Sequence, residues 1–510
     1  MSGLIERIAA TRRAKVKKML YQKALRDITR NRRCFLSIRE CCEILGVDMA
    51  CVRLSTESID DVFTCICAWD YYLIPGCLYA ALPLYAKLSP ESAIAFGAKA
   101  LLTDKQESDY PCIIVDDVMA AYCKLCGYIR EQNQLQRTVA VTGSVGKTTT
   151  KDMLKAVFKQ TSKTFCDVEN NNMATLVGYL VQHIPSDTET YIQEVHEGDP
   201  GSAKSISKII QPDIAVVTNI GESHLGNFGS YEDLLKGVTD ITAAMPENGI
   251  IIIDGDDGPS VDAPWDRRVI RVSAKNAEAN YYAENTRMTN NGLIFDIVFS
   301  GGRFGVELHM YGAHNVTNAL LAFAAGVESG ISPEQAVQGL NSYKPKGMRQ
   351  HVVKSGGRVL YIDCFNAALK SMKTALDTLG ELPLSVDGKR SAVLGDMAEL
   401  GNDSEKMHRE VGKLAADANI DELICYGPLS VFMAEEAKKA GKLQVYHTES
   451  MLELNKLVKE HVGANDAVLF KASHATNLIA SVRANYPLAF FKIIYLDRIQ
   501  RHFARTSGFK

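Results

Sequence analysis

The chain has 510 residues, of which 46% are hydrophobic and 23% are charged. At about 150 residues per domain, this length is enough for roughly three domains, each with its own core. The formal net charge of -3 gives no strong field of either sign and so excludes an extended basic surface for nucleic acid. Chemistry on small molecules is therefore the expected class of function.

The distribution of apolar residues indicates a cytoplasmic protein without a spanning segment. No long apolar region of a signal peptide opens the chain, and the longest apolar candidate, residues 487–496, is interrupted by Lys492. Thirteen cysteines are scattered along the chain, which fits a reducing compartment. Cys123 and Cys126 have the spacing of a redox motif, but the apolar helical stretch around them predicts buried packing.

The N-terminal third is predicted to form a small α/β domain. Residues 1–40 are basic and helix-prone, and predict a solvated helix that packs by its apolar side, with a membrane-surface or partner-binding helix as the alternative. Short apolar segments then alternate with turns as far as residue 128. The polar run over residues 130–136 reads as a linker, which places this domain at residues 1–132.

Two further α/β domains are predicted from strand-like apolar runs that alternate with helical stretches. A central domain with a parallel sheet, of the P-loop ATPase-like kind, is expected at residues 133–342, and a C-terminal Rossmann-like domain at residues 343–510. The strand-like runs are residues 138–141, 213–218, 249–253, 359–362, 392–394, 423–426 and 467–470. The predicted fold is thus a three-domain α/β protein.

The strongest local signal is Thr138-Val-Ala-Val-Thr-Gly-Ser-Val-Gly-Lys-Thr-Thr-Thr150, a strand that leads into a glycine turn and then a helix. Glycines allow backbone N–H groups to approach phosphate oxygens, the lysine reaches the terminal phosphates and the Thr148 hydroxyl can bind Mg²⁺. The nucleotide-binding candidates here are Gly143, Ser144, Val145, Gly146, Lys147, Thr148 and Thr149. Val141 stands where the longer P-loop motif has its first glycine, which argues against an ordinary ATPase.

Carboxylate and hydroxyl oxygens suit Mg²⁺, so Thr148 and Glu194, at the end of an expected strand, are candidate metal ligands, with Glu197 as a nearby competitor. His224 follows the expected strand at residues 213–218, at the edge where α/β sheets bind ligands, and is the third candidate. Without further context, Asn170 to Asn172 would fit a simple turn equally well.

A series of motifs resembles the Mur ligases. In chain order they are the phosphate loop, Asn170-Asn171-Asn172, Glu194 with Gly201 seven residues later, Thr218-Asn-Ile-Gly-Glu-Ser-His224, Gly312-Ala-His-Asn-Val-Thr-Asn318, Met348-Arg349, Asp363-Cys-Phe-Asn-Ala367, Leu394-Gly-Asp-Met-Ala-Glu-Leu-Gly401 and Lys471-Ala-Ser473. The last three are similar to the branch of the family that adds D-alanyl-D-alanine.

The resemblance implies an ATP- and Mg²⁺-dependent, ADP-forming amide-bond ligase that joins a UDP-muramoyl tripeptide to D-alanyl-D-alanine through an acyl phosphate, in peptidoglycan synthesis. It implies that Asn171, His314 and Asn315 contact the nucleotide, that Arg349 contacts its phosphate end and that Asp363 lies on the ribose side. Lys147, His224 and Arg349 would be the catalytic residues, and Thr148, Glu194 and His224 would bind the metal.

The sequence departs from the family pattern in ways that leave alternatives open. Val238 stands where the family often has a lysine that supports a second metal, and residues 57–59 and 75–80 match the family's UDP-sugar domain only loosely. One alternative is a Mur-like ligase of another pathway that joins a different carboxylate and amine. Another is a Mur-like protein that binds nucleotide without catalysis.

Overall fold

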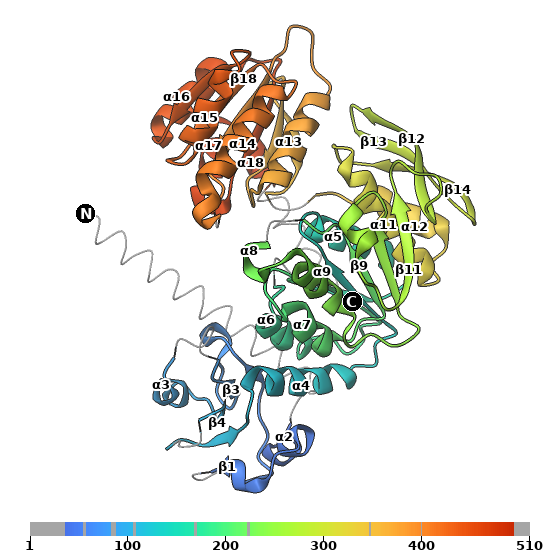
Figure 1. Cartoon of the computed structure of the whole chain (residues 1–510), viewed down its shortest axis with the longest axis vertical. Helices are drawn as coiled ribbons and strands as arrows, with labels where there is room; N and C mark the ends of the chain where they lie inside the picture. The colour runs from blue at the N-terminus through green and yellow to red at the C-terminus, as the bar shows by residue number, and fades with distance from the viewer. Residues whose placement is uncertain are drawn as a thin grey trace. The chain divides into compact units, whose positions relative to one another are not determined.

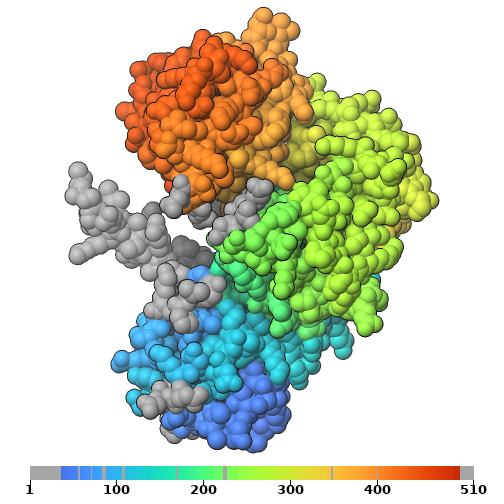
Figure 2. Space-filling model, viewed as in Figure 1, coloured from blue at the N-terminus to red at the C-terminus, as the bar shows by residue number. Residues whose placement is uncertain are grey.

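The computed structural model describes residues 36–54, 58–82, 88–105, 109–167, 171–221, 225–345, 348–398 and 400–493 (Figures 1 and 2). The chain divides into two compact units: residues 1–270 with 328–331 form the first, and residues 271–327 with 332–510 form the second. The domain boundaries predicted near residues 132 and 342 remain predictions.

The first unit begins with a five-stranded sheet in the order β1-β5-β4-β3-β2, in which only β1 is antiparallel to its neighbour. Ser37 and Asp117 cap the N-termini of the two longer helices, α2 and α4, with their side chains. The elements are α2 (Ile38–Leu45), β1 (Val52–Arg53), β2 (Ile66–Cys67), β3 (Leu78–Ala80), α3 (Pro90–Ala95), β4 (Ala100–Thr103), β5 (Cys112–Ile114) and α4 (Val118–Glu131).

The phosphate-loop sheet follows in the same unit. Five parallel strands take the order β10-β9-β6-β8-β7. Their residues are almost all buried, as expected for a parallel sheet covered on both faces. The elements are β6 (Arg137–Thr142), α5 (Lys147–Phe158), β7 (Thr164–Cys166), α6 (Ala174–Val181), β8 (Thr190–Glu194), α7 (Ser202–Ile210), β9 (Ile214–Val217), α8 (Leu225–Phe228), α9 (Tyr231–Thr239), β10 (Ile250–Asp254) and α10 (Gly258–Asp262).

Hydrogen bonds join the N-terminal sheet to helix α6. The side-chain amide of Gln182, just after α6, donates to the carbonyl of Ile66 at 2.8 Å and accepts from the Ile66 N–H at 2.8 Å. The indole N–H of Trp69 donates to the Thr175 hydroxyl at 2.7 Å, and the Tyr122 hydroxyl donates to the Thr175 carbonyl at 2.7 Å. Because these groups are largely buried, the bonds fix the orientation of the N-terminal sheet on the phosphate-loop sheet.

The second unit opens with strands in the order β14-β13-β12-β11, of which β12, β13 and β14 are antiparallel. Phe323 of helix α11 packs against Tyr281, Phe299 and Phe304 from these strands. The elements are β11 (Arg268–Ser273), which straddles the boundary between the units, β12 (Tyr281–Thr289), β13 (Gly292–Phe299), β14 (Gly302–Leu308), α11 (His314–Glu328) and α12 (Pro333–Ser342).

A six-stranded sheet completes the second unit, in orange to red in Figure 1. Its order is β15-β16-β20-β17-β18-β19, with only β15 antiparallel. The elements are β15 (His351–Ser355), β16 (Arg358–Asp363), α13 (Leu369–Glu381), β17 (Arg390–Gly395), α14 (Ser404–Asp417), β18 (Glu422–Tyr426), α15 (Ser430–Lys439), β19 (Gln444–Thr448), α16 (Met451–His461), β20 (Ala467–Lys471), α17 (Ile479–Asn485) and α18 (Pro487–Phe491).

The two faces of this sheet each have their own core. Tyr361 and Leu394 pack with residues of α13, α14 and α15, whereas Ile362 and Val393 pack with residues of α16, α17 and α18. This alternation along the strands is the Rossmann-like arrangement that the sequence predicted, and the α/β fold class is confirmed. Within the described part of the chain, no helix is long and apolar enough to cross a membrane.

Candidate functional site

The phosphate loop connects β6 to α5 in the first unit. Gly143 has φ of +119° and Gly146, the N-cap of α5, has φ of +95°, a backbone region that favours glycine. A Cβ atom at Gly143 would also lie 2.7 Å from the carbonyl oxygen of Asn219, so no side chain fits there. The first intrahelical bond of α5 runs from the Thr150 N–H to the Gly146 carbonyl at 2.9 Å, so the N–H groups before Thr150 lie at the helix N-terminus, where an anion would bind.

The segment after β9 holds the phosphate loop in shape. The Asn219 amide donates to the Val145 carbonyl at 2.7 Å and accepts from the Val145 N–H at 3.2 Å. The backbone N–H of Ser144 donates to the Asn219 carbonyl at 3.0 Å, and the Ser144 hydroxyl accepts from the Gly221 N–H at 2.7 Å. These bonds fix the loop before any ligand binds, which lowers the conformational entropy lost on binding.

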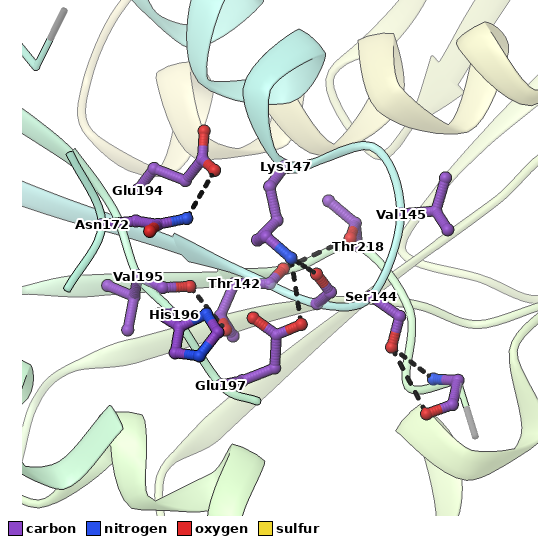
Figure 3. Close-up of polar contacts among 12 residues, drawn as sticks. Thr142, Ser144, Val145, Lys147, Asn172, Glu194, Val195, His196, Glu197 and Thr218 are labelled. Carbon is purple, nitrogen blue, oxygen red and sulfur yellow. Dashed lines mark hydrogen bonds and ion pairs between the residues drawn. The ribbon is translucent and has the colours of Figure 1, made fainter. Parts of the chain in front are cut away.

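Lys147 is the first residue of α5, and its side chain turns back over the loop (Figure 3). Its ammonium group donates to the Gly143 carbonyl and, at 2.9 Å, to the Glu197 carboxylate. Glu197 follows β8 and its side chain is only 1% exposed, compared with 14% for Lys147. The lysine is therefore held in place by a buried ion pair.

Glu194 ends β8 and lies beside Thr148. The Thr148 hydroxyl donates to one oxygen of the Glu194 carboxylate at 2.7 Å. The Asn172 amide donates to the other oxygen at 3.0 Å (Figure 3). The carboxylate and hydroxyl proposed as metal ligands from the sequence are thus adjacent. The sequence had assigned no individual role to Asn172. The backbone carbonyl of Asn171 accepts a hydrogen bond from the Gln193 side-chain amide at 2.9 Å.

A buried ion pair between Lys151 and Asp167 lies next to the Glu194 carboxylate. The Lys151 ammonium lies 3.1 Å from the Asp167 carboxylate and 3.9 Å from that of Glu194, and all three side chains are 3% exposed or less. Burial raises the pKa of Asp167 to about 7, although the Lys151 charge opposes this shift. Burial, the largest single effect, lowers the pKa of Lys151, but its acidic neighbours, led by Asp167, together outweigh burial and hold that pKa above its ordinary value.

A second group of predicted residues lies in the second unit, at the start of α11. The Asn315 amide donates to the Tyr311 carbonyl at 2.7 Å and to the side-chain carbonyl of Gln350 at 2.9 Å. The ring Nε2 of His314 lies 3.3 Å from the same Gln350 oxygen. Gln350, which has φ of +50°, thus joins two residues that the sequence predicted for nucleotide contact, a role that no local pattern indicated.

Arg349 and Asp363 belong to the same unit. The guanidinium of Arg349 lies 3.9 Å from the centre of the Phe365 ring, a cation–π contact. Asp363 ends β16 opposite Lys471 at the end of β20, and the two side chains form an ion pair of 2.6 Å. Lys471 also donates to the Asn366 carbonyl at 2.8 Å, so it ties the Asp363 motif to the sheet.

His314 gives the fold a defined pH dependence. Burial lowers its pKa from 6.5 to about 4, so it is neutral in the folded chain at pH 7. The unfolded chain binds a proton more readily between these two values, so stability falls as pH falls from about 6.5 to 4, by up to about 3 kcal/mol. In urea denaturation, the free energy of unfolding of His314→Gln should fall less than that of wild type as pH is lowered over this range. Replacement of the exposed His474 should leave the wild-type fall unchanged.

The remaining predicted residues are placed as follows. Thr149 is buried in the first turn of α5, and His224 lies outside the described residues. No group of three or more His, Cys, Asp or Glu side chains able to hold a metal occurs in the described part of the chain. Cys123 and Cys126 are buried and form no disulfide, and the predicted buried packing is confirmed. The two groups of candidate residues lie in different units, the phosphate loop in the first and His314, Asn315, Arg349 and Asp363 in the second.

A strand, a glycine loop and a helix with Lys147 and Thr148 define a nucleotide-binding enzyme of the P-loop type. Family models match the chain over residues 141–326, as the Mur ligase middle domain, and over residues 348–474, as the Mur ligase, glutamate ligase domain. The chain belongs to the Mur ligase family, and it is therefore an ATP-dependent, ADP-forming ligase.

Relatives with curated names are similar over most of the chain. The UDP-N-acetylmuramoyl-tripeptide--D-alanyl-D-alanine ligase of Bacillus subtilis (strain 168) is 34% identical over 397 residues, which are 76% of this chain and 85% of the relative. The enzyme of the same name from Escherichia coli (strain K12) is 31% identical, over 81% of this chain and 91% of the relative. A crystal structure of MurF from Acinetobacter baumannii has a TM-score of 0.75 at 23% identity and covers 88% of this chain and 98% of that one.

Proposed function

We propose that this ligase adds D-alanyl-D-alanine to a UDP-muramoyl tripeptide with ATP and Mg²⁺, as the names of its relatives indicate for those enzymes. The observation that carries the proposal is the ordered phosphate loop, with Lys147 fixed over it and Thr148 bonded to Glu194. This loop suits the triphosphate, and the similarity to relatives along most of the chain supports the substrate pair. The twelve described cysteines are free thiols, which supports a reducing, cytoplasmic setting.

The charges around the phosphate loop support a requirement for Mg²⁺. Two ammonium groups, Lys147 and Lys151, face three carboxylates, Asp167, Glu194 and Glu197, so the cluster has no positive charge to spare for a triphosphate. We propose that Thr148 and Glu194 bind Mg²⁺ together with phosphate oxygens and waters, since Mg²⁺ prefers oxygen ligands. The resemblance to the Mur ligases adds His224 as a further proposed ligand. When bound, the ion supplies positive charge beside the phosphate oxygens.

The reaction needs positioning rather than a protein nucleophile. An oxygen of the substrate carboxylate attacks the γ-phosphorus of ATP, ADP leaves and an acyl phosphate forms. The amine nitrogen then attacks the acyl carbon, phosphate leaves and the nitrogen loses a proton, which gives the amide. We propose that Lys147 neutralises charge on the terminal phosphate during the first step and that the N–H groups of the loop orient it.

Further nucleotide contacts are proposed for residues of the second unit. We propose that Asn171, in the first unit, with His314 and Asn315 contact the nucleotide, that Arg349 contacts its phosphate end and that Asp363 lies on the ribose side. A neutral His314 suits such a contact, because its ring can accept a hydrogen bond from a ligand. The stacking on Phe365 orients the planar guanidinium of Arg349, the group that suits contact with a phosphate.

One observation keeps a second candidate function open. Val238, where a metal-supporting lysine was expected, is buried on α9 with 1% exposure, and Lys236 is exposed on another face of that helix. The apolar side chain cannot bind a metal. Together with the loose match of residues 57–59 and 75–80 to the family's UDP-sugar domain, this change favours the alternative of a ligase of the same chemistry with a different carboxylate and amine.

The test measures phosphate release from ATP and Mg²⁺ with UDP-muramoyl tripeptide, with and without D-alanyl-D-alanine. We expect release only when both substrates are present, and a product with the mass of the joined peptide. Lys147→Ala is the control for contaminating ATPases. If the protein binds ATP but produces nothing from this pair, the substrate assignment is wrong, and other carboxylates and amines should be screened.

A further inference from the structure

Glu197 has a position that the proposed reaction does not explain. Its carboxylate points toward the phosphate loop and contacts the ammonium group of Lys147 at 2.9 Å (Figure 3). At 1% exposure it is among the most buried acidic side chains described. A negative charge buried at the place where a triphosphate must bind opposes that binding, so this residue calls for a physical account.

Glu197 is one of two acceptors that hold the ammonium group of Lys147. An ammonium group has three N–H donors. One donates to the Gly143 carbonyl and one to Glu197, and among the described residues no third acceptor is found. Two acceptors therefore fix the nitrogen above the loop, and the third donor stays available for a phosphate oxygen.

Electrostatics gives the second part. Glu197 cancels the charge of Lys147, and the nearby Lys151 is already balanced by Asp167 and Glu194. A triphosphate without a cation would approach a loop with no excess positive charge and with the Glu197 carboxylate nearby, in a largely buried environment where such interactions are strong. A divalent cation would offset about half of the charge of the triphosphate, so its metal complex would be repelled much less.

We propose that Glu197 is a positioning residue that fixes Lys147 over the phosphate loop and makes nucleotide binding depend on a divalent cation. The site then discriminates between the metal complex of ATP and free ATP at the binding step. This inference rests on the proposed nucleotide site, but it does not depend on which carboxylate and amine the enzyme joins.

The experiment measures ATP binding directly, by calorimetry on the full chain, in excess Mg²⁺ and in EDTA. For wild type we expect much weaker binding in EDTA. Glu197→Gln keeps an acceptor for Lys147 but removes the charge, so its affinity for ATP in EDTA should rise by about 10- to 100-fold. Its affinity in Mg²⁺ should change far less. The ratio of the dissociation constant in EDTA to the dissociation constant in Mg²⁺ should therefore be smaller than in wild type.

Matched variants separate this role from a structural one. Asp199→Asn removes an equal charge from the same loop, where Asp199 contacts His196 at 3.1 Å, and should leave the ratio at its wild-type value. Glu197→Asp keeps the charge and should retain the metal dependence. Glu197→Ala replaces the glutamine variant if that variant is unstable, and should shrink the ratio in the same way.

Two results would overturn the inference. If the glutamine and alanine variants show the wild-type ratio, Glu197 does not couple metal to nucleotide. If wild type binds no ATP under either condition, the nucleotide site itself is wrong. A third result is that the ratio shrinks in these variants as expected while wild type fails to ligate the proposed substrate pair. That result would support the inference and would count only against the proposed substrates.

Discussion

Replacement of Lys147 by alanine should lower kcat for ligation by about 100- to 1,000-fold, the range found when one pre-positioned donor to developing charge is removed. The reason is that Lys147 is the described side chain with an ammonium group fixed directly over the loop, by Gly143 and Glu197. The measurement is the steady-state rate of amide formation at saturating substrates, with product followed by mass.

The single variant also leaves Glu197 buried without its ion-pair partner, which should destabilise the fold and complicate the interpretation. The double variant Lys147→Ala with Glu197→Gln removes that charge. We expect it to recover stability in urea denaturation but not activity. If activity returned with stability, the loss in the single variant would be a folding effect and Lys147 would have no catalytic role.

Replacement of Lys151 by methionine should lower the free energy of unfolding by about 3–5 kcal/mol, as is usual when one partner of a buried ion pair is removed. The effect should be measured by urea denaturation at pH 8. At that pH the Asp167 carboxyl is ionised in the wild-type chain, because its pKa is about 7. Because the Lys151 charge opposes the rise in the pKa of Asp167, the variant must bury Asp167 either as an unpaired carboxylate or with a bound proton, and both cost free energy relative to the ionised carboxylate of the unfolded chain.

Two variants control this prediction. Lys163→Met breaks an ion pair with Asp187 at the same distance of 3.1 Å, but both side chains are more than 60% exposed, so the loss should stay below about 1 kcal/mol. Lys151→Met with Asp167→Leu removes both charges and should recover much of the stability. Equal losses for Lys151→Met and Lys163→Met would contradict the importance of burial.

The sequence predicted the elements whose signals are local. The strand at residues 138–141, the glycine turn and the helix that follows it correspond to β6, the phosphate loop and α5. The apolar runs at residues 359–362 and 467–470 are β16 and β20. Such runs are reliable because a parallel strand buried on both faces must be apolar throughout.

Contacts between distant residues could not be predicted in this way. Lys147 and Glu197 are 50 residues apart, and Gln350 meets Asn315 across 35 residues. Lys151 occupies a position on the buried face of α5, where a charge requires a partner, but nothing in its neighbourhood identifies Asp167. From the sequence, Glu197 was predicted only as a competing metal ligand, because its contact with the Lys147 ammonium group is apparent only in the folded chain.

The paired hydrogen bonds between Gln182 and Ile66 have a consequence for substrate choice. They make the N-terminal sheet and the phosphate-loop sheet parts of one body, so the distance from one to the other is set by the protein and not by the ligand. A molecule that binds on the N-terminal sheet and reacts at the phosphate loop must have the length of that separation. The first unit would then select the donor by its length, and a donor one residue too short or too long would be rejected even if its functional groups were correct.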